Sequence, residues 1–413
     1  LQTREQAMAN RNHLVNLTLL IASLLLTYLI LELIIFPRII THTPLRLHDA
    51  LGPHRLLAQF SKQGTEPEDY IAIFGDSYAQ GLGDWLVTAD SDKNLPFHSA
   101  HIINQQTGRD VISFGQGGSD SIQGYILLPY RYLTRINRSL AFELDDPAEI
   151  LVYFFEGNDI YDNLYRIERD YKPRFDINNI KDPDYFSGFI DYLHNNEKEL
   201  HENTVLVDSI PFAGALMRLL RTNIQGPAHP EEKKKNRSLV ADSINQVELD
   251  GNVRPLTRNS YANGPVLYAS GQEIDLAIYM FEQALVNVLQ RFRNTPVHVI
   301  YIPSVLSSYK LATGKVRTSG YREIPGNEYP SDLVYQRSDS ICRSIELLSK
   351  KHGANFGDTR PMIRSESGHT LLHGPQDITH FNKAGYTTLG KAAVTILNGS
   401  NNEYGCAALA ELH

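Results

Sequence analysis

Cysteine and tryptophan are scarce in this sequence. Its 413 residues include two cysteines, Cys342 and Cys406, and one tryptophan. Two cysteines exclude a disulfide-rich scaffold and a zinc site made of cysteine ligands. They suffice for one bridge in an oxidising compartment, and the sequence leaves open whether that bridge forms.

An excess of positive charge is also missing. The 39 lysines and arginines stand against 47 aspartates and glutamates, a formal net charge of −8. A protein that binds nucleic acid through its phosphates needs a basic face, so we expect no nucleic-acid partner. The 42% hydrophobic and 21% charged content is instead typical of a folded chain with a packed core.

Long apolar runs are absent, with one exception near the N-terminus. No charged residue occurs from Leu14 to Leu31, and the apolar composition continues to Ile35. About 20 such residues in a helix cross a hydrocarbon core of roughly 30 Å. The run therefore predicts one membrane-spanning helix over residues 15–36, after an N-terminal flank at 1–14.

Two other interpretations of this run stay open, a signal peptide and a buried helix of a soluble domain. A signal peptide has a shorter apolar stretch and small residues at its cleavage site, whereas Phe36, Pro37 and Arg38 follow here. Arginines lie on both sides, so the positive-inside rule does not fix the orientation. The short flank favours an inside N-terminus and an extracytoplasmic domain.

After the apolar run we expect a juxtamembrane linker at 37–67, one α/β domain at 68–398 and a frayed C-terminal tail at 399–413. Within the domain, the connection at about 162–270 is too long for one crossover and predicts a large insertion.

Four short apolar runs predict the strands of the domain. They lie at 70–74, 110–114, 150–155 and 297–302. These runs are continuously apolar rather than alternating, as expected for a parallel sheet that is buried on both faces. Apolar residues at three- and four-residue spacing predict helices at 273–293, 335–351 and 383–397.

Polar and glycine-rich motifs follow three of these strands. Ser77 lies in Phe74–Gly81, where a strand gives way to a helix, and this position suits a nucleophile with an oxyanion donor. The turn at 113–120 holds three glycines, whose backbone N–H groups can approach an anion closely. Asn158, in the turn at 156–159, offers an uncharged N–H donor to an oxyanion. Taken alone, each motif is more typical of a helix cap or an ordinary turn.

A fourth motif lies near the C-terminal end of the chain. In Asp377–Asn382, His380 has the chemistry of a general base near neutral pH. Asp377, three residues earlier, can accept a hydrogen bond from the imidazole and fix its tautomer. The loops that follow parallel strands gather at one edge of the sheet, so the four motifs are expected to share one crevice.

The order and spacing of these four motifs resemble the SGNH (GDSL-type) hydrolase superfamily. The resemblance covers roughly 68–161 and 295–397, and it implies a three-layer α/β/α sandwich with a flavodoxin-like parallel sheet. Carried over position by position, it makes Ser77 the nucleophile, His380 the base and Asp377 the acid that orients the base. The same resemblance implies an oxyanion hole formed by Ser77, Gly118 and Asn158.

Two features of the glycine turn depart from the family pattern. Ser113 stands where many members have asparagine. Gly115 also competes with Gly118 for the role of oxyanion glycine.

The resemblance implies a serine esterase that cleaves acyl or acetyl esters through an acyl-enzyme. The apolar run makes the expected enzyme membrane-anchored, with envelope glycans or lipids as candidate substrates. An O-acyltransferase that modifies a polysaccharide with the same intermediate is the first alternative. A non-catalytic envelope subunit is the second. No cofactor and no metal are expected.

Overall fold

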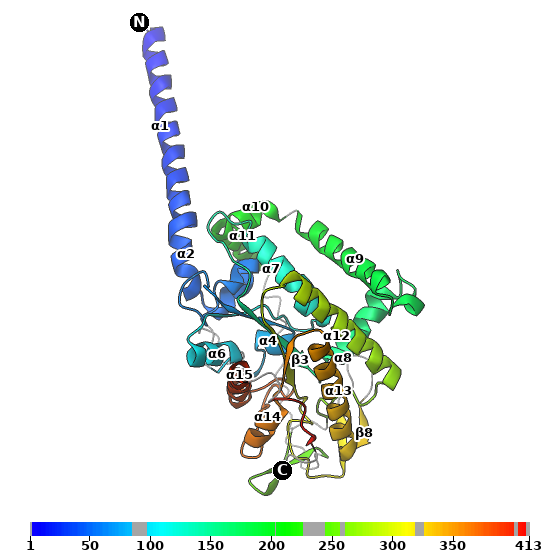
Figure 1. Cartoon of the computed structure of the whole chain (residues 1–413). Helices are drawn as coiled ribbons and strands as arrows, with labels where there is room; N and C mark the ends of the chain where they lie inside the picture. Colours follow the sequence, from blue (N-terminus) through cyan, green and yellow to red (C-terminus); the bar gives the residue numbers. More distant parts are fainter. Residues whose placement is uncertain are drawn as a thin grey trace.

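The computed structural model describes residues 2–84, 97–202, 204–225, 244–256, 261–318, 326–399 and 404–409. A five-stranded sheet lies at its centre, and neighbouring strands are parallel throughout (Figure 1). The strand order across the sheet is β2 (Val111–Ser113), β1 (Ile71–Phe74), β3 (Glu149–Phe155), β6 (Val297–Ile302) and β9 (Asn355–Asp358). This 2-1-3-4-5 order is that of a flavodoxin-like sheet, so the predicted fold class is confirmed.

The continuous apolar runs have the origin that the sequence predicted. Along β3, Ile150, Val152 and Phe154 belong to one hydrophobic core. The intervening Leu151, Tyr153 and Phe155 belong to a second core. Side chains alternate between the faces of a strand, so the two cores lie on opposite faces of the sheet.

Helices cover both faces and complete the three layers. The first core includes residues of α7 (Leu128–Ile136), α8 (Asp159–Arg166), α9 (Pro183–Glu202), α12 (Gly271–Arg291) and α13 (Ser331–Lys351). The second core includes residues of α6 (Ser99–Thr107), α14 (Arg360–Ser367) and α15 (Lys383–Asn398). The three predicted helices correspond to α12, α13 and α15.

The predicted insertion at 162–270 shares the core of the domain. Phe186 and Phe189 of α9 are buried in the first core, beside Tyr171. After α9 come α10 (Val205–Ser209), α11 (Pro211–Gln225) and a hairpin of β4 (Gln246–Leu249) and β5 (Asn252–Pro255). A second hairpin joins β7 (Lys315–Thr318) and β8 (Asn327–Pro330).

The N-terminal helix stands out from the domain in Figure 1. It consists of α1 (Gln2–Ile30), one π-helical turn (Leu31–Ile35) and α2 (Phe36–Ile39), and a 3-10 turn (Ile40–His42) ends it. The stretch Arg11–His42 reaches a mean hydropathy of 2.6, and 11% of its most apolar window is buried. By length and composition, this one helix can cross a membrane.

The segments on either side of the domain are more ordered than expected. Residues 37–67 do not form an extended linker, because Leu56, Leu57 and Ala58 are buried in the first core. The expectation of a frayed tail is wrong for residues 404–409. Cys406 forms a disulfide with Cys342, and Leu409 is fully buried.

Candidate active site

The turn between β1 and α4 (Ser77–Gln80) fixes the position of Ser77. The carboxylate of Asp76 caps this short helix by accepting the N–H of Tyr78 at 2.8 Å. Ser77 is the first residue of the helix, and its hydroxyl lies 3.2 Å from Asp76 Oδ2. Gly75 precedes this cap with a φ of +153°, and a Cβ there would lie 2.9 Å from Ala79 Cβ. The tight turn therefore needs a glycine directly before the aspartate and the serine.

The glycine turn after β2 is tied to the same short helix. The hydroxyl of Ser113 donates to the carbonyl of Ala79, and the N–H of Gly117 donates to Gln80 Oε1 at 2.7 Å. A Cβ on Gly117 would lie 3.8 Å from Ser77 Cβ, so this turn lies directly beside the serine. Ser113 thus holds the turn against α4.

Gly115 and Gly118 are glycines for different structural reasons. A Cβ on Gly115 would come within 2.3 Å of the Gln80 nitrogen, so close packing accounts for this glycine. Gly118 has a φ of +73°, no atom within 4 Å of its added Cβ, and an exposed position. Its conformation, rather than its packing, requires glycine, and the space beside it is open.

The turn after β3 places Asn158 at the start of α8. Its side chain is buried, and Nδ2 donates to Asp162 Oδ2 at 3.0 Å. Glu156 anchors the same turn. Its carboxylate accepts the N–H of Ser304 at 2.8 Å and the hydroxyl of Ser338 at 2.6 Å. These contacts connect the asparagine turn to the end of β6 and to α13.

The loop before α15 holds an aspartate–histidine pair. His380 Nδ1 lies 2.6 Å from Asp377 Oδ2. Asp377 Oδ1 accepts the N–H groups of Thr379 at 2.9 Å and His380 at 3.1 Å. Burial alone would raise the pKa of Asp377, but these hydrogen bonds outweigh it and hold the pKa below its ordinary value. The carboxylate is therefore ionised at neutral pH.

Contacts across about three hundred positions join the histidine loop to the serine turn. The hydroxyl of Tyr78 donates to the carbonyl of Thr379 at 2.8 Å, and the Tyr78 and His380 rings lie 5.6 Å apart. Asp84 accepts the N–H of Gln376 at 3.0 Å and also that of Asp377. The structure thus brings the two loops together.

The hydrogen bonds of the described residues do not join Ser77 to His380. The serine hydroxyl donates instead to Asp76. Asp377 holds the imidazole of His380 through its Nδ1 atom. Hydrogen bonds between catalytic groups are often long or unformed before substrate binds.

Two buried acids beside the serine carry raised pKa values. Burial raises the pKa of Asp76, although the Tyr78 N–H and the nearby His380 both lower it. Burial also raises the pKa of Asp159, and the charge of Asp76 adds to this effect. Asp159 accepts the N–H of Phe155 at 2.9 Å. The carboxyl ends of β1 and β3 therefore form a polar environment of low dielectric around Ser77.

Asp76, Asp84 and Asp162 are site residues that sequence reasoning did not single out. Asp76 had a visible signal, since an aspartate directly before a helix start is a preferred N-cap. Asp84 had none, because its partners lie 292 and 293 positions away.

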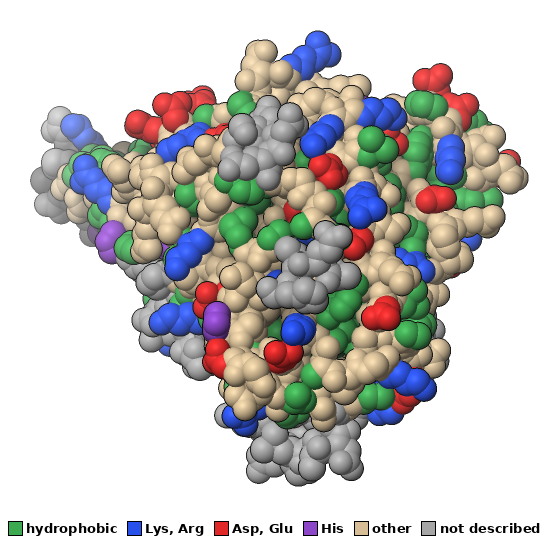
Figure 2. All heavy atoms as spheres, turned by 60° about the horizontal axis from the view of Figure 1, so that its bottom comes forward, with side chains coloured by type: hydrophobic (Ala, Val, Ile, Leu, Met, Phe, Trp, Pro, Cys, Tyr) green, Lys and Arg blue, Asp and Glu red, His purple; other side chains and the backbone are tan. Residues whose placement is uncertain are grey.

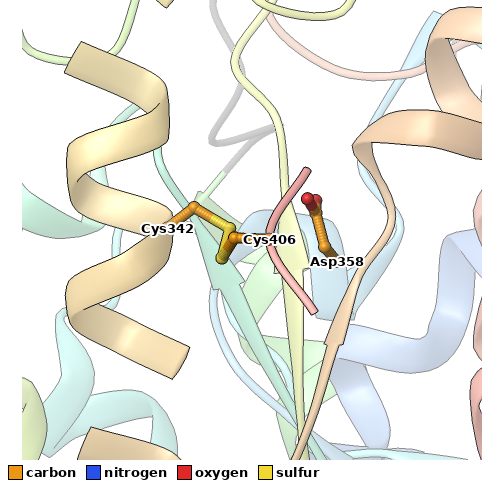
Figure 3. Close-up of side chains that lie close together, drawn as sticks. All are labelled: Cys342, Asp358 and Cys406. Carbon is orange, nitrogen blue, oxygen red and sulfur yellow. A yellow bond between two sulfur atoms is a disulfide. The ribbon is translucent and has the colours of Figure 1, made fainter. Parts of the chain in front are cut away.

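In the described part of the chain, one cluster of metal-ligand atoms occurs away from the site. It joins Cys342, Asp358 and Cys406 (Figure 3). Both sulfurs are committed to the disulfide, and the carboxylate of Asp358 forms an ion pair with Arg360 at 2.9 Å. This cluster is therefore a structural link between α13 and the C-terminal segment.

Comparisons with known proteins add little to this geometry. No family model and no curated protein matches the chain. Among solved structures, the chain is similar to a variant of an acetyl-xylooligosaccharide esterase from Geobacillus Stearmophilus, with 10% identity and a TM-score of 0.32 over 81% of this chain and 96% of that one. It is also similar to an alpha/beta hydrolase enzyme from the metagenome of Lake Arreo, Spain, with 10% identity and a TM-score of 0.33 over 81% and 98% of the two chains. At these values the similarity assigns neither family nor function.

Proposed function

We propose that the protein is a membrane-anchored serine esterase of the SGNH type. One observation carries the proposal. The loop with the His380–Asp377 pair is held against the turn that presents Ser77, through Tyr78 and Asp84. This arrangement brings a hydroxyl at the carboxyl end of β1 together with an oriented imidazole and an ionised carboxylate from the loop before α15.

The proposed reaction begins when the Ser77 hydroxyl turns from Asp76 towards His380. His380 Nε2 takes the proton as Oγ attacks the ester carbonyl carbon, and Asp377 stabilises the imidazolium that forms. The tetrahedral oxyanion is met by the N–H groups of Ser77 and Gly118 and by the side chain of Asn158. One such donor is worth roughly 2.7–4 kcal/mol of barrier.

Collapse of this intermediate breaks the bond to the alcohol, which leaves with the proton from His380. An acyl-enzyme on Ser77 remains. His380 then deprotonates a water molecule, whose attack releases the acid and restores the serine. Attack by a sugar hydroxyl in place of water would make the protein an acyltransferase.

The disulfide supports an extracytoplasmic location for the domain. Bridges such as Cys342–Cys406 form and persist in oxidising compartments and are rare in the cytosol. Together with the apolar exposed N-terminal helix, this favours a single-pass anchor with the domain outside.

The test uses the full chain in detergent, with p-nitrophenyl acetate and a fluorescent fluorophosphonate. We expect the wild type to hydrolyse the ester and to be labelled on Ser77. Ser77→Ala should abolish both at an unchanged melting temperature, whereas Ser344→Ala, which removes a surface hydroxyl on α13, should change neither.

Unchanged turnover in Ser77→Ala would refute the nucleophile. Absence of labelling and turnover in the wild type would favour the non-catalytic subunit. Transfer of the acetyl group to an added sugar, at the expense of hydrolysis, would favour the acyltransferase.

A further inference from the structure

The N-terminal helix meets the domain where the central strands begin. Phe36, at the base of the helix, packs against Phe142 with ring centroids 6.0 Å apart, and Phe142 precedes β3. The carbonyl of Pro37 accepts the hydroxyl of Thr65, which precedes β1, at 2.5 Å. We call this side of the domain, where β1 and β3 enter the sheet, the attachment end.

A buried glutamate fixes the direction of the helix at the attachment end. Glu32 is 1% exposed, and its Oε1 accepts the N–H of Phe212 at 2.9 Å. Its Oε2 accepts the N–H of Ala213 at 3.3 Å and the hydroxyl of Tyr28 at 2.9 Å. The carboxylate thus caps the first turn of α11, where the helix dipole favours negative charge. These contacts hold the helix in one orientation relative to the domain.

Exposed apolar side chains gather beside this contact. They are Val205 and Leu206 on α10, and Leu216, Met217 and Leu220 on α11. Since α11 begins at the level of Glu32, near the end of the apolar span, this face lies at the depth of the bilayer interface. An apolar helix face is stable there with its side chains in the headgroup region. The bilayer that holds the N-terminal helix is the occupant that fits this face.

Ser77 and Asn158 lie at the other end of the same strands. Ser77 follows β1 and Asn158 follows β3, so both lie beyond the carboxyl ends of the sheet. The seven residues of β3, at about 3.3 Å each, separate the two ends by roughly 20 Å. Figure 1 shows the N-terminal helix leaving on the side of α10 and α11, while α14 lies on the opposite side. We call the carboxyl ends of the strands, with the four motif loops, the site end.

From this placement we infer that the enzyme acts on acyl esters carried by water-exposed chains, such as polysaccharide, and not on the esters of bilayer lipids. The inference rests on the proposed function, and it chooses between the two substrate classes that the sequence left open. Figure 2 brings forward the side opposite the N-terminal helix, where basic, acidic and hydrophobic side chains are interspersed over the described atoms.

The experiment places the full chain in lipid nanodiscs with a fluorogenic acetyl ester on a phospholipid headgroup. The ester is joined either directly or through polyethylene glycol spacers of increasing length. A tethered group reacts only when its linker spans the distance to the site. We therefore expect the direct ester to react at least about tenfold more slowly than an ester on a spacer longer than roughly 20 Å.

Two controls separate the possible failures. A soluble acetyl ester tests the proposed function itself, and if the nanodisc enzyme does not hydrolyse it, both the function and this inference fail. The same spacer series in detergent tests geometry against chemical preference, because all spacers should then react alike. Equal rates for direct and long-spacer esters in nanodiscs would overturn the inference. A preference for long spacers that persists in detergent would also overturn it.

Discussion

The attachment end and the site end terminate the same strands, yet different interactions hold them. Aromatic packing and ion pairs, together with the hydrogen bonds of the buried Glu32, hold the attachment end. Examples are Phe36 against Phe142 and the bidentate pair of Arg135 with Asp208, at 2.8 and 2.9 Å. Hydrogen bonds between loops, with buried carboxylates among them, hold the site end. The comparison shows that the two ends of one sheet can differ in role. Side-chain packing and paired charges fix one end to the N-terminal helix, whereas polar turns at the other end present the candidate site.

The sharpest test of this division is Asp377→Asn at the site end. The amide keeps a side-chain oxygen that can accept the backbone N–H groups, but it cannot stabilise an imidazolium. We expect kcat for p-nitrophenyl acetate to fall by about 10³–10⁴-fold, with the melting temperature changed by no more than a few degrees. A loss of only a few-fold would mean that the pair does not act in catalysis.

Asp84→Ala tests whether the contact between the loops positions the histidine. Two N–H groups of the histidine loop lose their acceptor, so His380 should be less well placed and kcat should fall by about 10–100-fold. Asp84→Asn keeps an acceptor and should restore most of the rate. If both variants lost the same activity, the charge of Asp84 rather than its position would matter.

Glu32→Ala tests the attachment end, and it should give the opposite result. The N–H groups of Phe212 and Ala213 would lose their partner in a buried place, which costs about 1–3 kcal/mol of stability. Turnover of a soluble ester should stay unchanged, because Glu32 and Ser77 lie at opposite ends of the strands. Glu32→Gln, which keeps an acceptor, is the matched control. Chemical denaturation in detergent and initial rates measure the two effects separately, and a fall in kcat would contradict the division.

Lowering the pH should reduce the stability of the folded chain through buried histidines at both ends. Burial lowers the pKa of His54, beside Phe142 at the attachment end, to about 4, and that of His98, beside Gln80 near the site end, also to about 4. The unfolded chain binds these protons near pH 6.5, so stability is complete above that pH and falls as the pH drops towards 4. Each histidine should contribute a slope of up to about 1.4 kcal/mol per pH unit. His54→Phe and His98→Phe should each flatten the denaturation curve against pH, and an unchanged slope would contradict the buried neutral form.

The sequence predicted those parts of the fold that local composition determines. Four strands were predicted because burial on both faces produces unbroken apolar runs. The fifth strand, β9, was missed because Phe356 is the one large apolar residue in Asn355–Asp358. This strand forms through pairing with β6 and contact with α15, where a Cβ on Gly357 would lie 2.5 Å from Ile396. Such tertiary determinants leave no local pattern.

The same limit applies to the candidate site. Ser77, Asn158, His380 and Asp377 lie in short motifs whose residue types carry their own chemistry, so they were visible in the sequence. Asp84 accepts backbone N–H groups 292 and 293 positions away, and Glu32 accepts groups 180 and 181 positions away. The residues next to such an acid in the sequence do not mark its role. The serine and histidine loops were expected to meet, whereas the contacts that hold them together required coordinates.

The disulfide closes the C-terminal part of the domain into a covalent loop. It links positions 342 and 406, which are 64 residues apart, and so encircles β9, α14, the histidine loop and α15. The proposed general base therefore belongs to a covalent ring that is completed only after thiol oxidation. In a chain retained where thiols stay reduced, this ring would remain open. Under the proposed extracytoplasmic location, closure of this ring would follow transfer of the domain into an oxidising compartment.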